Sequence, residues 1–118
     1  MIDAINIPIY GGVIYLSVSD DPLVERRKHD DKFGMCLVTS CNALASSSDC
    51  GGQFALFFKK DFFTHGIIAH EIFHLTHRIL DARSLNFTMS HQESHAYLCE
   101  WITDWVYKTL KANNIYAH

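Results

Sequence analysis

The chain has 118 residues, a net charge of −3 and 48% hydrophobic residues, which suits one globular domain spanning residues 1–118. The charge gives no electrostatic reason to expect nucleic-acid binding, and no apolar run approaches the roughly 20 residues of a membrane-spanning helix. The first four residues lack the basic and apolar segments of a secretory signal, so we expect a cytoplasmic protein with reduced cysteines, a Cys41–Cys50 bridge being the alternative.

Two strands joined by a glycine turn are predicted near the start of the chain. Apolar and β-branched side chains fill residues 5–10 and 13–18, and Gly11 and Gly12 separate the two segments. A strand, a two-residue glycine turn and a second strand are typical of a β-hairpin. Pro8 has no backbone N–H to donate, so the first strand should lie at a sheet edge.

A short helix and two further strands should follow the hairpin. Asp21 and Pro22 are typical of an N-cap and a first helical residue, and they open a helix that runs to about residue 31. Residues 35–40 predict a third strand, and the small polar residues of 42–52 predict a loop. Residues 53–59 are mostly apolar and predict a fourth strand.

Two long helices are predicted in the second half, because no glycine or proline occurs after Gly66. Thr64, with Asp61 as the competing residue, suits the N-cap of a helix that ends at about residue 83. A polar interval then precedes a second helix, from about residue 90 to residue 112. The order β-β-α-β-β-α-α predicts an α+β domain in which a small mixed sheet packs on helices.

The first long helix carries an H-E-x-x-H motif, which runs from His70 through Glu71 to His74. Two histidines four residues apart lie on one helix face and can share a zinc ion, while Glu71 can take a proton from a zinc-bound water. A catalytic zinc also needs a third protein ligand. Glu93, which 18 residues separate from His74, suits that role in the first turn of the second helix. The alternatives for the third ligand are Glu100, His91 and His95.

The motif and its spacing to Glu93 resemble the gluzincin metallopeptidases, which have the pattern HEXXH-x18-E, and the small size resembles the minigluzincins. Residues 93–98, with Trp101 after them, are similar to small metallopeptidase-like proteins of bacteriophages and their hosts. The resemblance implies a zincin-like domain that hydrolyses peptide bonds at one Zn²⁺. The zinc ligands would be His70, His74 and Glu93, with Glu71 as the general base. A histidine third ligand would indicate the SprT-like group instead.

Two further expectations follow from the resemblance. In gluzincins the strand before the motif helix is an exposed edge that binds the substrate as an added strand, so residues 53–58 are the expected substrate strand. The alternative is an ordinary half-buried strand. Tyr97 follows Glu93 by one helical turn, where thermolysin-like enzymes have an aspartate. Tyr97 either donates a hydrogen bond to the developing oxyanion as a catalytic residue or fills the core.

Two classes of function are therefore open. The first is a zinc metallopeptidase that acts on a peptide or on one specific protein, in a phage or mobile-element context. The second is a catalytically weak or inactive zinc-binding interaction module, because the chain is small and no transition-state donor is assigned. The sequence leaves the oligomeric state open, and neither a nucleic-acid nor a membrane partner is expected.

Overall fold

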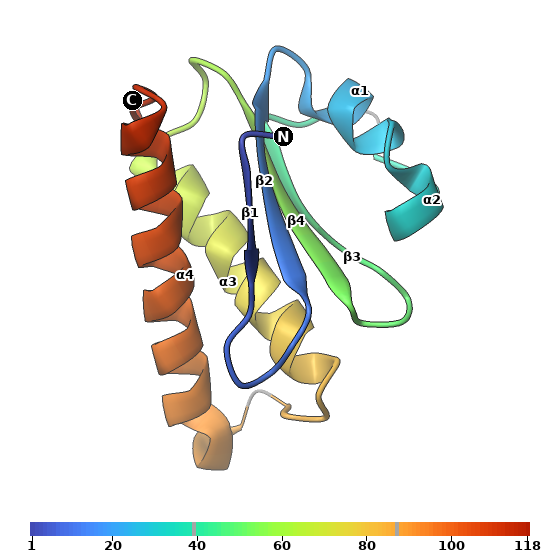
Figure 1. Cartoon of the computed structure of the whole chain (residues 1–118), viewed down its shortest axis with the longest axis vertical. Helices are drawn as coiled ribbons and strands as arrows, with labels where there is room; N and C mark the ends of the chain where they lie inside the picture. Colours follow the sequence, from blue (N-terminus) through green and yellow to red (C-terminus); the bar gives the residue numbers. More distant parts are fainter. Residues whose placement is uncertain (39, 87) are drawn as a thin grey trace.

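A four-stranded mixed sheet forms the centre of the structure (Figure 1). The computed structural model describes residues 1–38, 40–86 and 88–118. The two outer pairs of strands are antiparallel and the inner pair, β2 and β4, is parallel. In spatial order the strands are β1 (Asp3–Asn6), β2 (Val13–Ser19), β4 (Gln53–Lys59) and β3 (Ala43–Ser47).

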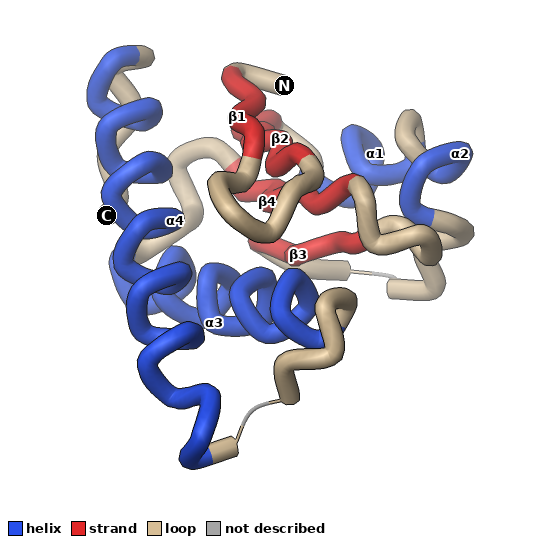
Figure 2. Tube along the Cα trace, turned by 60° about the horizontal axis from the view of Figure 1, so that its bottom comes forward, coloured by secondary structure: helices blue, strands red, loops and turns tan. Residues whose placement is uncertain are grey.

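Helices cover both faces of this sheet (Figure 2). Ile14, Phe54 and Leu56 point to the face where α3 and α4 pack, and they join the main core. Ala55 and Phe57 point to the opposite face, where Phe33 of α2 packs on them. Successive strand residues point to opposite faces, so burial on both faces explains the continuous apolar run of β4. The predicted α+β class is confirmed. The helices are α1 (Pro22–Arg27), α2 (Asp30–Phe33), α3 (His65–Asp81) and α4 (Gln92–Ala112), with a 3₁₀ turn at Met89–His91 before α4.

The helix boundaries follow from side-chain caps. Thr64 is the N-cap of α3, and its Oγ1 accepts a hydrogen bond of 3.1 Å from the N–H of Ile67. Asp21 caps α1 through a hydrogen bond of 3.0 Å from the N–H of Leu23, and Pro22 is the first helical residue. Both predicted caps are confirmed. None of the described helices is long and apolar enough to cross a membrane.

The connection between β1 and β2 is longer than the predicted two-residue turn. β1 ends at Asn6, and the N–H of Ile7 donates to the carbonyl of Gly12 at 2.9 Å, which closes a loop over residues 7–12. Pro8 lies within this loop, because it cannot donate to the ladder. Ile9 has a left-handed backbone (φ 69°) and its side chain is 97% exposed.

The third strand does not form where it was predicted. Residues 34–38 and residue 40 have no regular secondary structure, and the predicted strand also includes residue 39, which lies outside the described residues. β3 forms instead inside the predicted loop of residues 42–52. Its alternating small and apolar residues pair with β4, and Leu44 packs on the Phe33–Phe57 cluster. Tertiary pairing with a buried strand therefore outweighs the local β-propensity of residues 35–40.

β4 is an inner strand, so the prediction that residues 53–58 form an exposed edge is wrong. The strand is paired on one side with β2 and on the other with β3. Residues 54–58 are all fully buried, so the alternative of a half-buried strand also fails. The edges of the sheet are β1 and β3. The continuous apolar sequence of β4 already favours a central strand, because an edge strand in water is normally apolar on one face only.

A buried arginine of α1 forms hydrogen bonds to both α2 and the edge strand β3. Arg26 is 5% exposed, and its Nε donates to Ser46 Oγ of β3 at 2.8 Å. Its Nη2 donates to the carbonyls of Phe33 and Gly34 at 3.0 and 2.9 Å, and its Nη1 pairs with Asp30 at 2.8 Å. The planar guanidinium satisfies all four partners at once, which fixes the chain between α1 and β3.

Candidate metal centre

The two motif histidines lie side by side on the outer face of α3. The opposite face of the helix is anchored in the core by buried residues at helical spacing, among them Ile68, Ile72 and Leu75. His70 and His74 are therefore exposed, and their ring centroids are 4.7 Å apart at an angle of 75°. Their Nε2 atoms are 3.2 Å apart. The amphipathic pattern of the helix thus presents both imidazoles to the same point in solvent.

The separation of the two nitrogens suits a shared metal ion. Two nitrogen ligands on a tetrahedral zinc, each at 2.0–2.1 Å, are about 3.3–3.4 Å apart. The 3.2 Å between His70 Nε2 and His74 Nε2 is close to that value. Two neutral imidazoles at this distance must share one proton in a hydrogen bond, since a ring nitrogen with its lone pair cannot donate. A cation that accepts both lone pairs satisfies the same geometry, so the histidine pair fits zinc.

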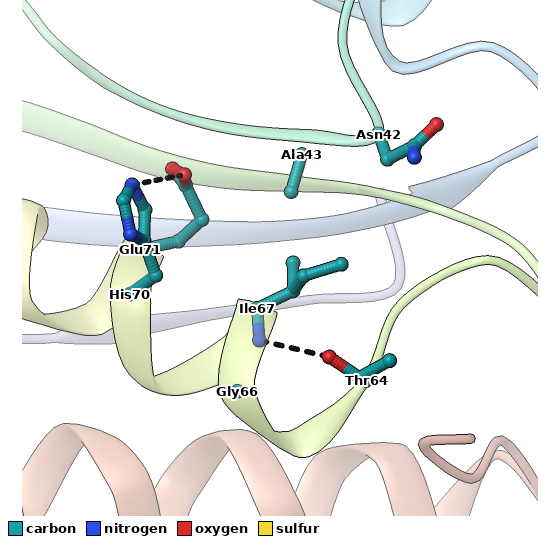
Figure 3. Close-up of a pocket in the computed structure, with 7 residues that line it drawn as sticks. All are labelled: Asn42, Ala43, Thr64, Gly66, Ile67, His70 and Glu71. Atoms are coloured by element: carbon teal, nitrogen blue, oxygen red, sulfur yellow. Dashed lines mark hydrogen bonds and ion pairs between the residues drawn. The ribbon is translucent and has the colours of Figure 1, made fainter.

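Glu71 is a buried carboxylate next to this pair. It is 7% exposed, and its Oε1 lies 3.8 Å from His70 Nε2. In Figure 3, the Glu71 side chain extends toward the strand that carries Ala43, and the His70 ring lies beside its carboxylate. The two residues line a hollow of about 380 Å³ between β3 and the start of α3. The other residues around it are Asn42, Ala43, Thr64, Gly66 and Ile67.

Glu93 and Tyr97 line a different hollow. That hollow has a volume of about 460 Å³, and it lies between α4 and the loop that connects β1 to β2. Within residues 1–38, 40–86 and 88–118, no group of three or more His, Cys, Asp or Glu side chains is arranged to hold a metal ion. The structure thus brings together His70, His74 and Glu71, but it does not bring Glu93 to them.

The packing of α3 against α4 indicates which part of α4 lies opposite the histidine pair. His65 Nδ1 is hydrogen-bonded to the hydroxyl of Tyr107 at 2.7 Å, and the rings of His77 and His95 are 5.8 Å apart. The two contacts are twelve residues apart on each helix, so α3 and α4 run antiparallel and stay level with each other between the contacts. By this register, Glu100, an exposed residue of α4, is level with the point midway between His70 and His74, although among the described residues it does not form a three-residue metal group with them either.

The two histidine alternatives for a third ligand have other contacts. His95 is 6% exposed, lies against His77, and donates from Nδ1 to the carbonyl of His91 at 3.0 Å. His91 donates from Nδ1 to the carbonyl of Asn86 at 2.9 Å. His77 packs against His95 where α3 and α4 meet, so this histidine contact is separate from the His70–His74 pair.

The hollow that contains His70 and Glu71, called the motif hollow below, has a side formed by Asn42 and Ala43, which sequence patterns did not identify. Asn42 and Ala43 belong to a segment that was predicted as a loop, and neither residue type carries a metal-binding or catalytic signature. Only the pairing of β3 with β4 shows that these residues lie beside His70. Comparisons with protein-family models, with curated protein sequences and with solved structures found no match for this chain.

Proposed function

We propose that this chain is a zinc-dependent metallopeptidase in which His70 and His74 hold the metal and Glu71 is the general base. The observation that carries the proposal is the 3.2 Å separation of the two Nε2 atoms, with a buried carboxylate beside them. The H-E-x-x-H motif, with its resemblance to the gluzincins, supplies the reaction class. A zincin-like relation between the sheet and α3 is part of the same proposal.

The third ligand in this proposal is a carboxylate of α4. Glu93 has the sequence spacing of the gluzincins, whereas the register of α3 against α4 favours Glu100. Both are glutamates on one helix and both are exposed, so the same substitution to glutamine tests each of them. The variant that loses metal identifies the ligand, and the other variant serves as its control.

The position of Glu71 supports its proposed role as the general base. A bound zinc would supply a water of lowered pKa and would polarise the carbonyl of the scissile peptide bond. Glu71 takes the proton of the attacking water, because its carboxylate lies within 3.8 Å of His70 Nε2 and opens to the motif hollow. The same carboxyl group then gives the proton to the leaving amine, so Glu71 starts and ends the cycle ionised.

The edge strand β3 is the proposed peptide-binding strand, in place of residues 53–58. β3 is an edge of the sheet, and Ala43 at its start lines the hollow that contains His70 and Glu71. An extended peptide that adds to the free edge of β3 would pass beside the histidine pair and would be held by main-chain hydrogen bonds.

One observation favours a second candidate function, that of a zinc-binding interaction module without turnover. No third ligand stands next to the histidine pair among the described residues. Tyr97, the predicted oxyanion donor, lines the hollow of Glu93 rather than that of His70. Such a module would bind zinc through the same histidines but would not need Glu71 as a base.

The test combines metal content with proteolysis. Wild type and the variants His74→Ala, Glu93→Gln and Glu100→Gln are loaded with zinc, dialysed and measured by elemental analysis and by titration with a chelator. We expect about one zinc per wild-type chain, as in a single catalytic site. His74→Ala should lose the metal, and one of the two glutamate variants should bind it more weakly. Wild type that stays free of zinc would refute both candidate functions.

Proteolysis then separates the peptidase from the interaction module. Zinc-loaded wild type and Glu71→Gln are incubated with an unfolded protein such as reduced, carboxymethylated lysozyme, and new peptides are identified by mass spectrometry. The peptidase proposal expects cleavage by wild type and loss of cleavage in Glu71→Gln, which keeps its zinc. Equal cleavage by the two proteins would contradict the role of Glu71, and a wild type that binds zinc but cleaves none of the substrates tested would favour the module.

A further inference from the structure

The hollow between α4 and the β1–β2 loop is built from aromatic rings and one carboxylate. Tyr97 and Trp101 contribute to it from α4, and Tyr10 contributes from the loop. Pro8 and Leu98 add apolar surface. Of the described residues that line this hollow, Glu93 is the one with a charge. Glu93, Tyr97 and Trp101 follow one another at intervals of four, so they form a stripe on one face of α4.

The loop side of this hollow is held firmly in place. Arg83, just after α3, donates from Nε to the carbonyl of Tyr10 at 2.6 Å and from Nη2 to the carbonyl of Gly11 at 3.1 Å. The N–H of Gly11 donates to the carbonyl of Ile7 at 3.2 Å. These bonds keep Ile9 in its left-handed backbone conformation, with its side chain in solvent at the rim of the hollow. Residues with strained backbones cluster at active sites and ligand-binding sites, so the strain at Ile9 draws attention to this hollow.

We propose that this hollow binds an arginine side chain of a partner protein. Aromatic faces attract cations, and a guanidinium both stacks on a ring and pairs with a carboxylate through its planar N–H groups. Tyr10, Tyr97 and Trp101 supply the rings, and Glu93 supplies the opposite charge. The apolar surface of Pro8 and Leu98 suits the methylene stem that leads to the guanidinium.

The composition of the hollow also indicates that the arginine belongs to a polypeptide. A free amino acid would bring an α-carboxylate and an α-ammonium group, and the described lining of the hollow offers no positive charge for the carboxylate and no anion for the ammonium besides Glu93, which the guanidinium would occupy. Glu93 would repel that carboxylate. Within a peptide the α-carboxylate is an amide, so the repulsion disappears. The proposal does not require zinc at the histidine pair, because neither His70 nor Glu71 lines this hollow.

The test is a titration of the full chain with three small probes. They are Nα-acetyl-L-arginine N-methylamide, the corresponding citrulline compound and free L-arginine. Citrulline has nearly the same shape as arginine without the charge. Binding is followed by the indole N–H signals in ¹H–¹⁵N NMR spectra. Trp101 lines the hollow, while the indole of Trp105 donates to Asp3 at 3.1 Å and serves as an internal reference.

We expect saturable shifts of the Trp101 signal with the arginine amide and a constant Trp105 signal. Citrulline amide should bind about fivefold more weakly, which is the upper end for one solvent-exposed ion pair. Glu93→Gln should weaken the arginine amide by a similar factor and reduce its advantage over citrulline to what the aromatic rings provide. Tyr97→Leu should weaken binding, whereas Tyr97→Phe, which keeps the ring, should not.

Three outcomes would overturn the proposal. No saturable shift of Trp101 would mean that the hollow does not bind this chemistry. Equal binding of arginine and citrulline amides would mean that charge plays no part. Tighter binding of free L-arginine than of its amide would point to an amino-acid ligand in place of a protein partner. Glu93 is also a candidate metal ligand, so all titrations are made in metal-free buffer, where loss of zinc cannot explain the effect of Glu93→Gln.

Discussion

Replacing Ile9 by glycine should stabilise the fold, although it removes a large apolar side chain. The backbone at this position has φ 69°, a conformation that costs an L-residue about 1–2 kcal/mol and a β-branched residue near the upper end of that range. The side chain is 97% exposed, so its removal sacrifices almost no burial. Glycine adopts this conformation freely, which makes relief of strain the main effect of Ile9→Gly.

The expected gain is the relief of strain minus the entropy of the more flexible unfolded chain. That entropy costs about 0.5–1 kcal/mol for a new glycine. The net stabilisation is then about 1–1.5 kcal/mol, which raises the melting temperature of a chain of this size by roughly 3–8 °C. Urea unfolding, followed by tryptophan fluorescence, gives the free energy of unfolding directly.

Gly11 provides the matched control with the opposite sign. Its φ is 72°, and a Cβ atom added to it would meet no other atom within 4 Å. Gly11→Ala therefore changes backbone strain without steric overlap, and it should destabilise by about 1 kcal/mol. The reasoning is refuted if Ile9→Gly lowers the free energy of unfolding, or if Gly11→Ala leaves it unchanged.

Three other predictions concern the metal, the buried arginine and the thiols. Zinc at one hundred times its dissociation constant should raise the free energy of unfolding of wild type by about 2.7 kcal/mol and its melting temperature by roughly 10 °C. His74→Ala should show no such shift. An equal shift in both proteins, measured by calorimetry, would contradict the proposed metal site. Arg26→Met should cost about 2–4 kcal/mol in urea unfolding, since it leaves buried acceptors without a donor, and Arg26→Lys should recover less than half because an ammonium cannot span the same partners. The Ser48 hydroxyl lowers the pKa of the exposed Cys50 thiol, whereas burial raises the pKa of Cys41. Cys50 should therefore react with iodoacetamide before Cys41 at neutral pH, and Ser48→Ala should slow its reaction. Mass spectrometry that finds Cys41 modified before Cys50 would refute this order.

The parts of the fold that local chemistry dictates were predictable from the sequence. Thr64 and Asp21 cap their helices as expected, because each side chain reaches backbone N–H groups only a few residues away. The apolar spacing of α3 likewise determined which face would be buried. The position of β3 was not predictable, since residues 43–47 become a strand only through β4 and through the bond from Arg26 to Ser46. These partners are distant in sequence and leave no local signal.

In the candidate site, too, local geometry was predictable from the sequence and the packing of distant elements was not. His70 and His74 lie four residues apart on one helix, so their pairing follows from helix geometry alone, and the structure brings them together. The relation of Glu93 to that pair depends on how two helices cross, and an 18-residue spacing does not determine this crossing. The register through His65–Tyr107 and His77–His95 is a property of packing, and it turns Glu93 and Tyr97 toward the loop that carries Ile9.

The bond between β1 and α4 has a consequence for when the fold can form. Asp3 Oδ2 accepts hydrogen bonds from the Trp105 indole at 3.1 Å and from the Thr109 hydroxyl at 3.2 Å. More than one hundred residues separate these partners along the chain, so bringing them together closes a long loop at a high entropic cost. We expect these hydrogen bonds to form late in folding, with the other long-range contacts. On the ribosome, β1 can pair with β2 early, but Asp3 gains these two partners only after α4 has emerged. The histidines of α3 are thus synthesised before the helix that completes the core around them, and a nascent chain should acquire its native packing only after α4 has left the exit tunnel.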